Sequence, residues 1–177
     1  MNGFFNPCAV SNGIDQQRTL PDSLRMKKIF HSLAELAEHV GQDVAVSDWI
    51  TITQDQVNQF AHATHDHQWI HTDPERAKLG PFGAPVAHGF LTLSLLPCLF
   101  DSAFEIQRVS MGVNYGLNKV RFTAPVPVGS RIRGHMHLLA CEPIEPAGLQ
   151  MTWRVRVERE GSDKPVCVAE SMVRQYA

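Results

Sequence analysis

The sequence predicts an α+β fold in which an antiparallel sheet wraps around one apolar helix. The chain has 177 residues, which is enough for one domain with a core of its own. A run of apolar residues over 90–100 is hydrophobic on nearly every side, as expected of a helix inside a fold. The segments that follow alternate apolar and polar side chains, which is typical of antiparallel strands with one solvated face.

The composition and net charge of the chain disfavour nucleic acids and membranes as partners. Sixteen Lys and Arg residues against eighteen Asp and Glu residues give a formal net charge of −2. Nucleic acids and anionic membranes recruit concentrated basic surfaces, so neither is expected as a partner. The most apolar stretch, residues 86–100, contains a histidine, a glycine and a proline and is shorter than the roughly 20 residues that cross a bilayer. We therefore expect no membrane span.

The cysteines indicate a reducing compartment. They are widely scattered and form no C-x-x-C pair: Cys8, Cys98, Cys141 and Cys167. This usage is typical of a reduced, cytoplasmic protein.

The N-terminal residues differ in character from the rest of the chain. Residues 1–26 lack a continuous apolar segment, so we expect a poorly ordered leader and not a signal peptide. Met26 opens a better patterned segment and is a candidate start of the native chain, which N-terminal sequencing would test. Residues 27–177 are expected to form a single domain.

Two capping boxes predict helices in the first half of the chain. Ser32-Leu-Ala-Glu35 precedes apolar residues at helical spacing and predicts a helix over residues 32–40. Thr53-Gln-Asp-Gln56 opens a second helix. Between the two, residues 44–51 alternate loosely, as a strand does.

A third short helix and the central helix follow. Asp73 before Pro74 supplies an N-cap and a first-turn proline for a helix that Gly80 ends. A loop then leads into the apolar helix, expected over about residues 89–100. Cys98 lies in this helix and is expected to be a small core residue.

Four strands are expected after the central helix, because turn residues divide the remaining chain into alternating segments. The segments lie around residues 113–123, 131–141, 149–158 and 166–174. Met151, Trp153 and Val155 point to one face of the third segment, while Thr152 and Arg154 point to the other.

Histidines are concentrated in one part of the sequence. The chain has nine, and five of them fall between residues 62 and 88: His62, His65, His67, His71 and His88. Asp66 and His71 lie where one helix ends and before the next begins. A carboxylate and an imidazole across such a turn can converge on one water molecule and move a proton near neutral pH.

Gly89 is a candidate anion-binding position. If the central helix begins at residue 88 or 89, the Gly89 N–H is a free first-turn donor at the positive end of the helix dipole. A glycine lets a carbonyl group approach the backbone closely. The position could therefore stabilise negative charge that develops on a bound carbonyl oxygen.

Three stretches of the sequence resemble a known family. They read D-H-Q-W-I-H-x-D-P-x-R-A from Asp66, H-G-F-x-T-L from His88, and Y-G-L-N-K-V-R-F-x-A-P-V-P-V-G-S from Tyr115. Together they look like the MaoC-like, NodN-like branch of the hotdog-fold (R)-specific enoyl-CoA hydratases. The resemblance runs from about residue 27 to the C-terminus.

The resemblance implies a fold and a reaction. The fold would be a hotdog, whose curved sheet wraps the helix over residues 89–100, and two subunits would form a homodimer. The activity would be the reversible, cofactor-independent addition of water to a trans-2-enoyl thioester of coenzyme A or acyl carrier protein, giving an (R)-3-hydroxyacyl product. The catalytic Asp and His of the family fall on Asp66 and His71, and the backbone oxyanion donor falls on Gly89.

The sequence departs from the family at two positions. Many hydratases read D-x-N-P-x-H, whereas this chain has Gln68 and Trp69 at the Asn-Pro positions. Gln68 is expected to orient Asp66 or the pocket loop through its amide. His88 is expected either to contact substrate or to be held by loop backbone.

Other functions remain open at the level of sequence. A hotdog thioesterase would direct water at the thioester carbonyl, and a non-catalytic acyl-thioester-binding protein would keep the pocket without turnover. The H-x-H pair His65 and His67 could join His71 in a metal site, although the segment reads as helix end and loop, and we expect no metal. Lys119, Arg121 and Arg133 are expected to be solvated charges rather than a coenzyme A phosphate site.

Overall fold

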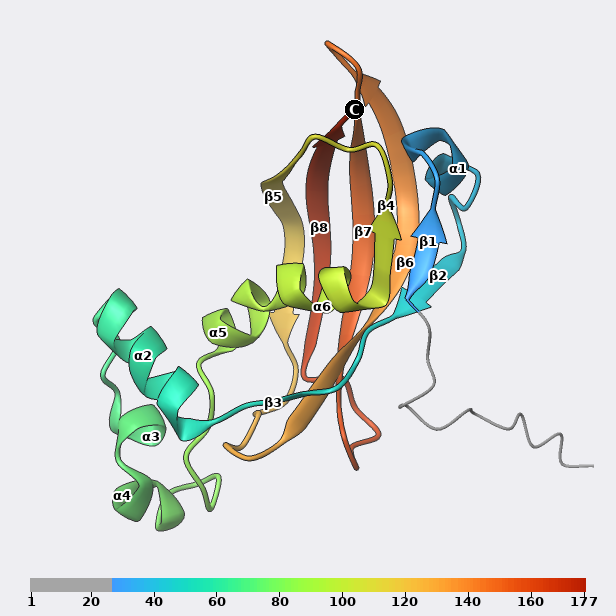
Figure 1. The fold of residues 1–177 in the computed structure, drawn as a ribbon. Coiled ribbons are helices and arrows are strands. Elements are labelled where there is room, and N and C mark those ends of the chain that lie inside the picture. The colour runs from blue at the N-terminus through green and yellow to red at the C-terminus, as the bar shows by residue number, and fades with distance from the viewer. Residues whose placement is uncertain (1–26) are drawn as a thin grey trace, which may run out of the picture.

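A computed structural model describes residues 27–177. The expected leader and the candidate start at Met26 lie outside the described residues. An antiparallel sheet with strand order β2-β6-β7-β8-β5, in which β3 also pairs with β6, curves around the α5–α6 segment (Figure 1). This arrangement confirms the predicted α+β class.

The strands of the sheet are long in the second half of the chain. Their bounds are β2 (Asp43–Val46), β3 (Ile50–Thr51), β5 (Met111–Phe122), β6 (Arg131–Ile144), β7 (Gly148–Arg159) and β8 (Cys167–Tyr176). The last four correspond to the four predicted strands. The single strand predicted over 44–51 is divided into β2 and β3, which pair in succession with β6 and are interrupted at residues 47–49, where Ser47 is buried. The Ser47 hydroxyl accepts a hydrogen bond from the Gly134 N–H at 2.8 Å and donates one to the Asp48 carbonyl.

The helices are short. They are α1 (Leu33–Ala37), α2 (Gln54–Thr64), α3 (Trp69–Thr72), α4 (Pro74–Lys78), α5 (Gly89–Ser94) and α6 (Leu96–Ala103). Thr53 and Gln56 form the predicted capping box of α2, and the Asp73 side chain accepts from the Arg76 N–H as the predicted N-cap of α4. The Ser32 side chain caps α1, which ends at Ala37, earlier than predicted.

The central helix differs from the single helix predicted over 89–100. It consists of α5 and α6, which are joined at Leu95. Pro97 has no N–H to donate to the Leu93 carbonyl, so the α-helical hydrogen-bond ladder is interrupted there. The helical path resumes with the Leu99 N–H bonded to the Leu95 carbonyl at 3.0 Å and extends to Ala103.

The central helix is buried on one face in the described chain. Leu91, Leu96 and Leu99 are buried, whereas Phe90 is 69% exposed. The expectation that Cys98 is a core residue is wrong, because its side chain is exposed. The sequence suggested burial all round because apolar residues also occupy the face that points away from the sheet.

The core lies between α6 and the concave face of the sheet. Along β6 and β7 the inward residues are buried, and the outward ones are more exposed, which confirms the predicted alternation. A Cβ added at Gly134 would lie 2.9 Å from the end of the Met136 side chain and 3.4 Å from Leu99. The glycine therefore lets α6 approach β6 closely.

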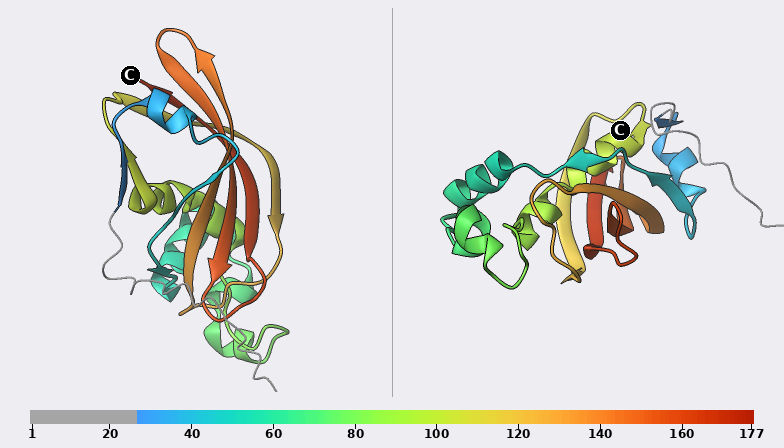
Figure 2. Two further views of the ribbon diagram at one scale, coloured as in Figure 1. Left: turned by 90° about the vertical axis from the view of Figure 1, so that its right-hand side faces the viewer. Right: turned by 90° about the horizontal axis from the view of Figure 1, so that it is seen from below.

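A small parallel pair closes one end of this core. It consists of β1 (Lys28–Phe30) and β4 (Phe104–Ile106), and it lies beside the main sheet (Figures 1 and 2). The Phe30 and Phe104 rings meet edge to face at 5.8 Å. Neither strand was predicted. Among the described residues, no helix is long and apolar enough to cross a membrane.

Candidate active site

Three chain segments meet at the N-terminal end of α5: the turn after α2, helix α3, and the loop that precedes α5 (Figure 1). Helix α2 ends at Thr64, and its C-cap residue His65 adopts a left-handed backbone with a φ of 60°. This residue reverses the chain direction and is followed directly by Asp66. Helix α3 then carries His71 into the interior, and His88 caps the start of α5.

His71 is held by two backbone interactions. Its side chain is 7% exposed, and Nδ1 lies 2.6 Å from the Val86 carbonyl oxygen. Because a carbonyl oxygen only accepts, Nδ1 carries the hydrogen, and Nε2 of the neutral ring holds the free lone pair. The Gln54 amide donates to the His71 carbonyl at 2.8 Å, which fixes the backbone of the same residue.

Burial lowers the pKa of His71 below the usual histidine value of 6.5, because the charged ring loses solvent. The hydrogen bond to Val86 and the Asp66 carboxylate act in the opposite direction, and the neighbouring His88 adds to the lowering. The net direction favours the neutral imidazole at physiological pH. His71 therefore presents a basic Nε2 lone pair.

His88 packs directly against the His71 ring. Its side chain is 3% exposed, its ring stacks on the His71 ring at 3.8 Å, and its other neighbour is the Phe60 ring at 5.0 Å. Nε2 of His88 donates to the Asp66 carbonyl oxygen at 2.9 Å. Nδ1 is buried without a hydrogen-bond partner among residues 27–177. His88 thus holds the turn that carries Asp66 and keeps a second buried acceptor free.

Asp66 is the solvent-facing member of the group. Its carboxylate is 57% exposed, with Oδ2 at 4.0 Å from His88 Nε2, and Oδ1 accepts from the Gln68 backbone N–H at 3.4 Å. The candidate ligand atoms of Asp66, His71 and His88 all lie within 4.8 Å of one another. The carboxylate oxygen and the two imidazole nitrogens are groups that can hold a water molecule or a small cation. His65 and His67, the H-x-H pair considered from sequence, lie outside it.

Gly89 is the first residue of α5 and lies against an aromatic ring. A Cβ at this position would be 2.7–2.9 Å from ring atoms of Phe122, and Phe90 packs on that same ring at 5.7 Å. Gly89 also lines an apolar pocket of 330 Å³ together with Ile70 and Phe122. Glycine at residue 89 therefore lets the Phe122 ring pack directly on the start of α5, at the edge of the pocket that both residues line.

Gln68 and Trp69 occupy the positions where the sequence departs from the common motif. Gln68 is exposed and is the N-cap residue of α3, but its side chain makes no capping bond, and its backbone N–H is the group that contacts Asp66. Trp69 packs beneath Arg76 at 4.5 Å and lies so close to Gly80 that a Cβ there would be 2.9 Å from the indole. The tryptophan thus anchors α3 against α4.

Sequence reasoning missed four residues that support the site: Gln54, Phe60, Val86 and Phe122. Val86 acts through its carbonyl oxygen, so its side-chain type carries no signal. Gln54 lies within the recognised capping box of α2, but its contact with His71 depends on how α2 packs on α3. The alternation of β5 could have indicated on which face Phe122 lies, but not that Gly89 lies opposite.

The architecture places the chain in the hotdog class. The (R)-hydratase from A. caviae superposes with a TM-score of 0.61 at 24% identity, over 76% of this chain and 94% of that one. A MaoC-like dehydratase from Rhodospirillum rubrum has a TM-score of 0.66 at 21% identity, over 82% of this chain and 96% of that one. At these identities the likeness concerns the fold.

Sequence comparison identifies the family. The profile of the MaoC like domain matches residues 35–161, and the chain belongs to this family. It is 55% identical over 150 residues to 3-hydroxyacyl-thioester dehydratase Z of Mycobacterium tuberculosis, covering 85% of this chain and 99% of that protein. It is 46% identical over 140 residues to nodulation protein N of Rhizobium leguminosarum bv. viciae, covering 78% of this chain and 87% of that protein. The resemblance to the MaoC-like and NodN-like branch is thereby confirmed.

The close contact at Gly89 predicts a specific pattern of stability. We expect Gly89→Ala to lower the free energy of unfolding by about 1–3 kcal/mol, because the methyl group would overlap the Phe122 ring. Phe122→Leu in the same chain should recover part of this loss, and urea denaturation of the four chains of the double-mutant cycle measures the coupling. Ser94→Ala, an exposed position of α5, is the control. Equal stability of Gly89→Ala and wild type would show that the contact does not constrain the helix.

Proposed function

We propose that the protein is a hydro-lyase that reversibly adds water to trans-2-enoyl thioesters and forms (R)-3-hydroxyacyl thioesters without a cofactor. The observation that supports this most directly is the meeting of a neutral His71, an exposed Asp66 carboxylate and the free N-terminus of α5 in one place. The named activity of the mycobacterial relative, a 3-hydroxyacyl-thioester dehydratase at 55% identity, favours the same chemistry.

The geometry suggests a role for each member of the pair. The water lies between Asp66 and His71, and Asp66 accepts a hydrogen bond from one of its O–H groups. The Nε2 lone pair of His71 takes the other proton while the water oxygen bonds to C3. The C2–C3 π electrons move to the thioester carbonyl, forming an enolate. The His71 imidazolium then returns its proton to C2, so one water is added to the double bond.

The enolate oxygen is stabilised by the backbone. The Gly89 N–H belongs to the first turn of α5 and has no partner within the helix, so it can donate to the thioester oxygen as negative charge develops. The free Nδ1 of His88 can accept a hydrogen bond from substrate or from a bound water. The exposed amide of Gln68 lies at the rim, where it can contact the carrier end of the substrate.

One assay separates this function from its alternatives. Crotonyl-CoA and longer trans-2-enoyl thioesters of coenzyme A and acyl carrier protein are incubated with the protein. Loss of enoyl absorbance without thiol release, with an (R)-3-hydroxyacyl product, supports hydration. Thiol release supports a thioesterase, and binding without either reaction supports an acyl-thioester-binding protein.

Substitution of the pair should abolish most of the activity. We expect Asp66→Asn and His71→Ala each to lower kcat by about two orders of magnitude or more in the crotonyl-CoA assay, because each removes a group that holds or deprotonates the water. Thermal melts check that the variants fold. His67→Ala, which changes an exposed neighbour in the histidine cluster, should retain wild-type turnover.

The same assay after dialysis against a chelator addresses the metal alternative. Unchanged turnover is expected if Asp66 and His71 act as acid–base groups. Loss of activity that zinc or iron restores would contradict the proposed mechanism.

The lowered pKa of His71 determines the acid limb of the pH profile. The neutral ring is the active form, so activity should fall as pH decreases through the lowered pKa and not at the ordinary histidine value. We expect the acid limb of kcat/KM to lie below pH 6.5. Titration of the His71 ring by NMR in the free enzyme should likewise give a pKa below 6.5. An acid limb above that value would rule out His71 as the base.

We propose further that the protein is a homodimer that pairs through β5. This strand ends the sheet order and is bonded to β8 on one side alone within the described chain. Its exposed face carries a stripe of large apolar side chains, with Tyr115 at 50% and Leu117 at 45% exposure. A strand that has one unpaired edge and an apolar face is a site for association with a second copy.

Disrupting this stripe should therefore produce monomers. We expect Leu117→Lys to shift the sedimentation coefficient from dimer to monomer. Leu79→Lys is the matched control, because Leu79 is 91% exposed at the C-terminal end of α4, outside the apolar stripe of β5, and should not change the oligomeric state. A wild-type protein that sediments as a monomer would contradict the proposal.

A further inference from the structure

The local backbone alone does little to fix the turn that carries Asp66. The Asp66 carboxylate is 57% exposed, so packing does not set its direction. The preceding residue, His65, has a φ of 60°, a left-handed conformation that is unfavourable for residues other than glycine. Residues 66–72 contain no proline that would stiffen the chain. The position of the carboxylate must therefore depend on specific contacts from outside the turn.

Two side chains hold three successive carbonyl groups of this turn. Nε2 of His88 donates to the Asp66 carbonyl oxygen at 2.9 Å. The Thr72 hydroxyl lies 3.2 Å from the His67 carbonyl oxygen and 3.3 Å from the Gln68 carbonyl oxygen. Because a hydroxyl group has one hydrogen, Thr72 shares it between these two acceptors. The turn is thus held on one side by the N-cap of α5 and on the other by the last residue of α3.

The Thr72 contact reaches further than a helical threonine usually does. A threonine hydroxyl commonly bonds the carbonyl four residues earlier, which here is the bond to Gln68. The bond to His67 goes one residue beyond the N-cap of α3 and into the turn. Thr64, the last residue of α2, shows the ordinary case. Within residues 27–177 its hydroxyl bonds the Phe60 carbonyl alone, at 2.7 Å.

The backbone that Thr72 holds also directs the carboxylate. Asp66 Oδ1 accepts a hydrogen bond from the Gln68 N–H at 3.4 Å, in the manner of an Asx-turn, so a displacement of residue 68 moves the carboxylate as well. Thr72 follows His71 directly in α3. One four-residue helix therefore carries the imidazole and, through the next side chain, holds the turn that presents the carboxylate.

We propose that Thr72 is a positioning residue whose hydroxyl, together with His88, keeps the Asp66 carboxylate where it can share a water molecule with His71. This inference rests on the proposed function, because the shared water is the one that the reaction consumes. In this role Thr72 contacts neither the water nor the substrate and acts through the backbone of residues 67 and 68. Loss of the hydroxyl should therefore slow the chemical step and leave substrate binding nearly unchanged.

Removing and restoring the hydroxyl tests this role in the crotonyl-CoA assay. Thr72→Val keeps the shape of the side chain and should lower kcat about tenfold, because a small misplacement of a reacting group is costly. KM should change by less than about twofold. Thr72→Ser retains the hydroxyl and should keep kcat within about twofold of wild type. Thermal melts check that the variants fold.

Thr64→Val is the matched control for Thr72→Val. It makes the same chemical change at the end of the neighbouring helix, at an exposed threonine whose hydroxyl does not reach the turn. We expect its turnover to equal that of wild type. Wild-type kcat in Thr72→Val, or an equal loss in Thr64→Val, overturns the inference.

A double-mutant cycle tests whether Thr72 acts through Asp66. The tenfold effect of Thr72→Val should shrink to about twofold or less in the Asp66→Asn chain, since the group that Thr72 positions is no longer a carboxylate. The acid limb of the pH profile should be the same in Thr72→Val as in wild type, because the surroundings of the His71 ring are unchanged. A full tenfold loss in both chains would give Thr72 a different role and contradict the proposal.

Carboxyl NMR separates failure of this inference from failure of the proposed function. The carbon signal of the Asp66 carboxyl group, assigned by its loss in Asp66→Asn, reports on the turn without turnover. We expect this signal to move in Thr72→Val and to stay in place in Thr64→Val. If it moves in a protein that hydrates no substrate, the positioning role stands and the proposed function fails. If crotonyl-CoA is hydrated and the signal does not move, the positioning role fails and the hydratase stands.

Discussion

The hydrogen bond between His71 and the Val86 carbonyl fixes the position of the site relative to the sheet. Val86 also donates its N–H to the Ile70 carbonyl at 3.0 Å, and the next residue, Ala87, donates to Val126 at 2.8 Å. A single extended segment thus ties α3 on one side to the chain before β6 on the other. Because the same bond fixes the tautomer of His71, the position and the chemistry of the imidazole depend on one contact.

The three polar groups of the site differ in their exposure to solvent. His71 and His88 are stacked and shielded from solvent, and burial lowers the pKa of His71, so its ring stays neutral with a free lone pair. Asp66 stays in contact with solvent. A site with all three groups buried would have to desolvate a carboxylate at a cost of several kcal/mol. Placing the carboxylate at the solvent edge avoids this cost and leaves a route by which water can reach the pair.

Local signals in the sequence predicted much of this structure. Capping boxes and strand alternation depend on residues a few positions apart, so the starts of α2 and α4 and the faces of β6 and β7 were correct. The β1–β4 pair joins Lys28 to Phe104, and no local pattern reports such a contact. Asp66 and His71 were singled out because a carboxylate and an imidazole follow the end of a helix, and the family motif pointed to the same pair. Val86 and Gln54 act through packing that the sequence does not display.

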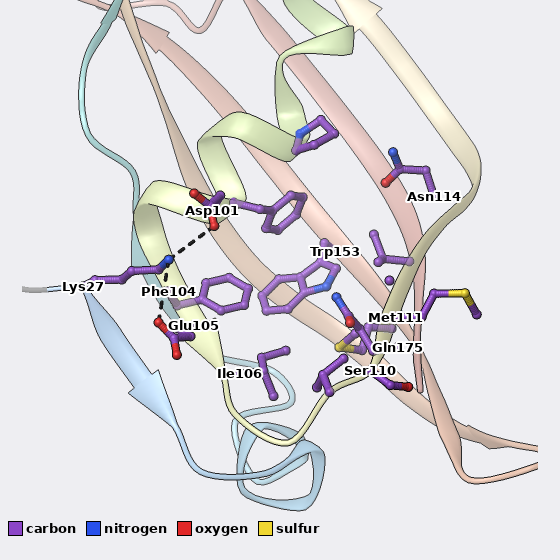
Figure 3. Close-up of a pocket in the computed structure, with 16 residues that line it drawn as sticks. Lys27, Asp101, Phe104, Glu105, Ile106, Ser110, Met111, Asn114, Trp153 and Gln175 are labelled. Atoms are coloured by element: carbon purple, nitrogen blue, oxygen red, sulfur yellow. Dashed lines mark hydrogen bonds and ion pairs between the residues drawn. The ribbon is translucent and has the colours of Figure 1, made fainter. Parts of the chain in front are cut away.

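The interruption at Leu95 divides the central helix into two segments that line different pockets. Before it, Gly89 and Thr92 of α5 line the pocket beside the reaction centre. After it, Pro97 and Phe100 of α6 line a different pocket of 470 Å³ (Figure 3). The two pockets therefore lie along successive segments of the same helical stretch. Proline at residue 97 interrupts the hydrogen-bond ladder, so the first segment of the helix lies beside His88 and Gly89 while the second packs through Leu99 on Gly134 of β6.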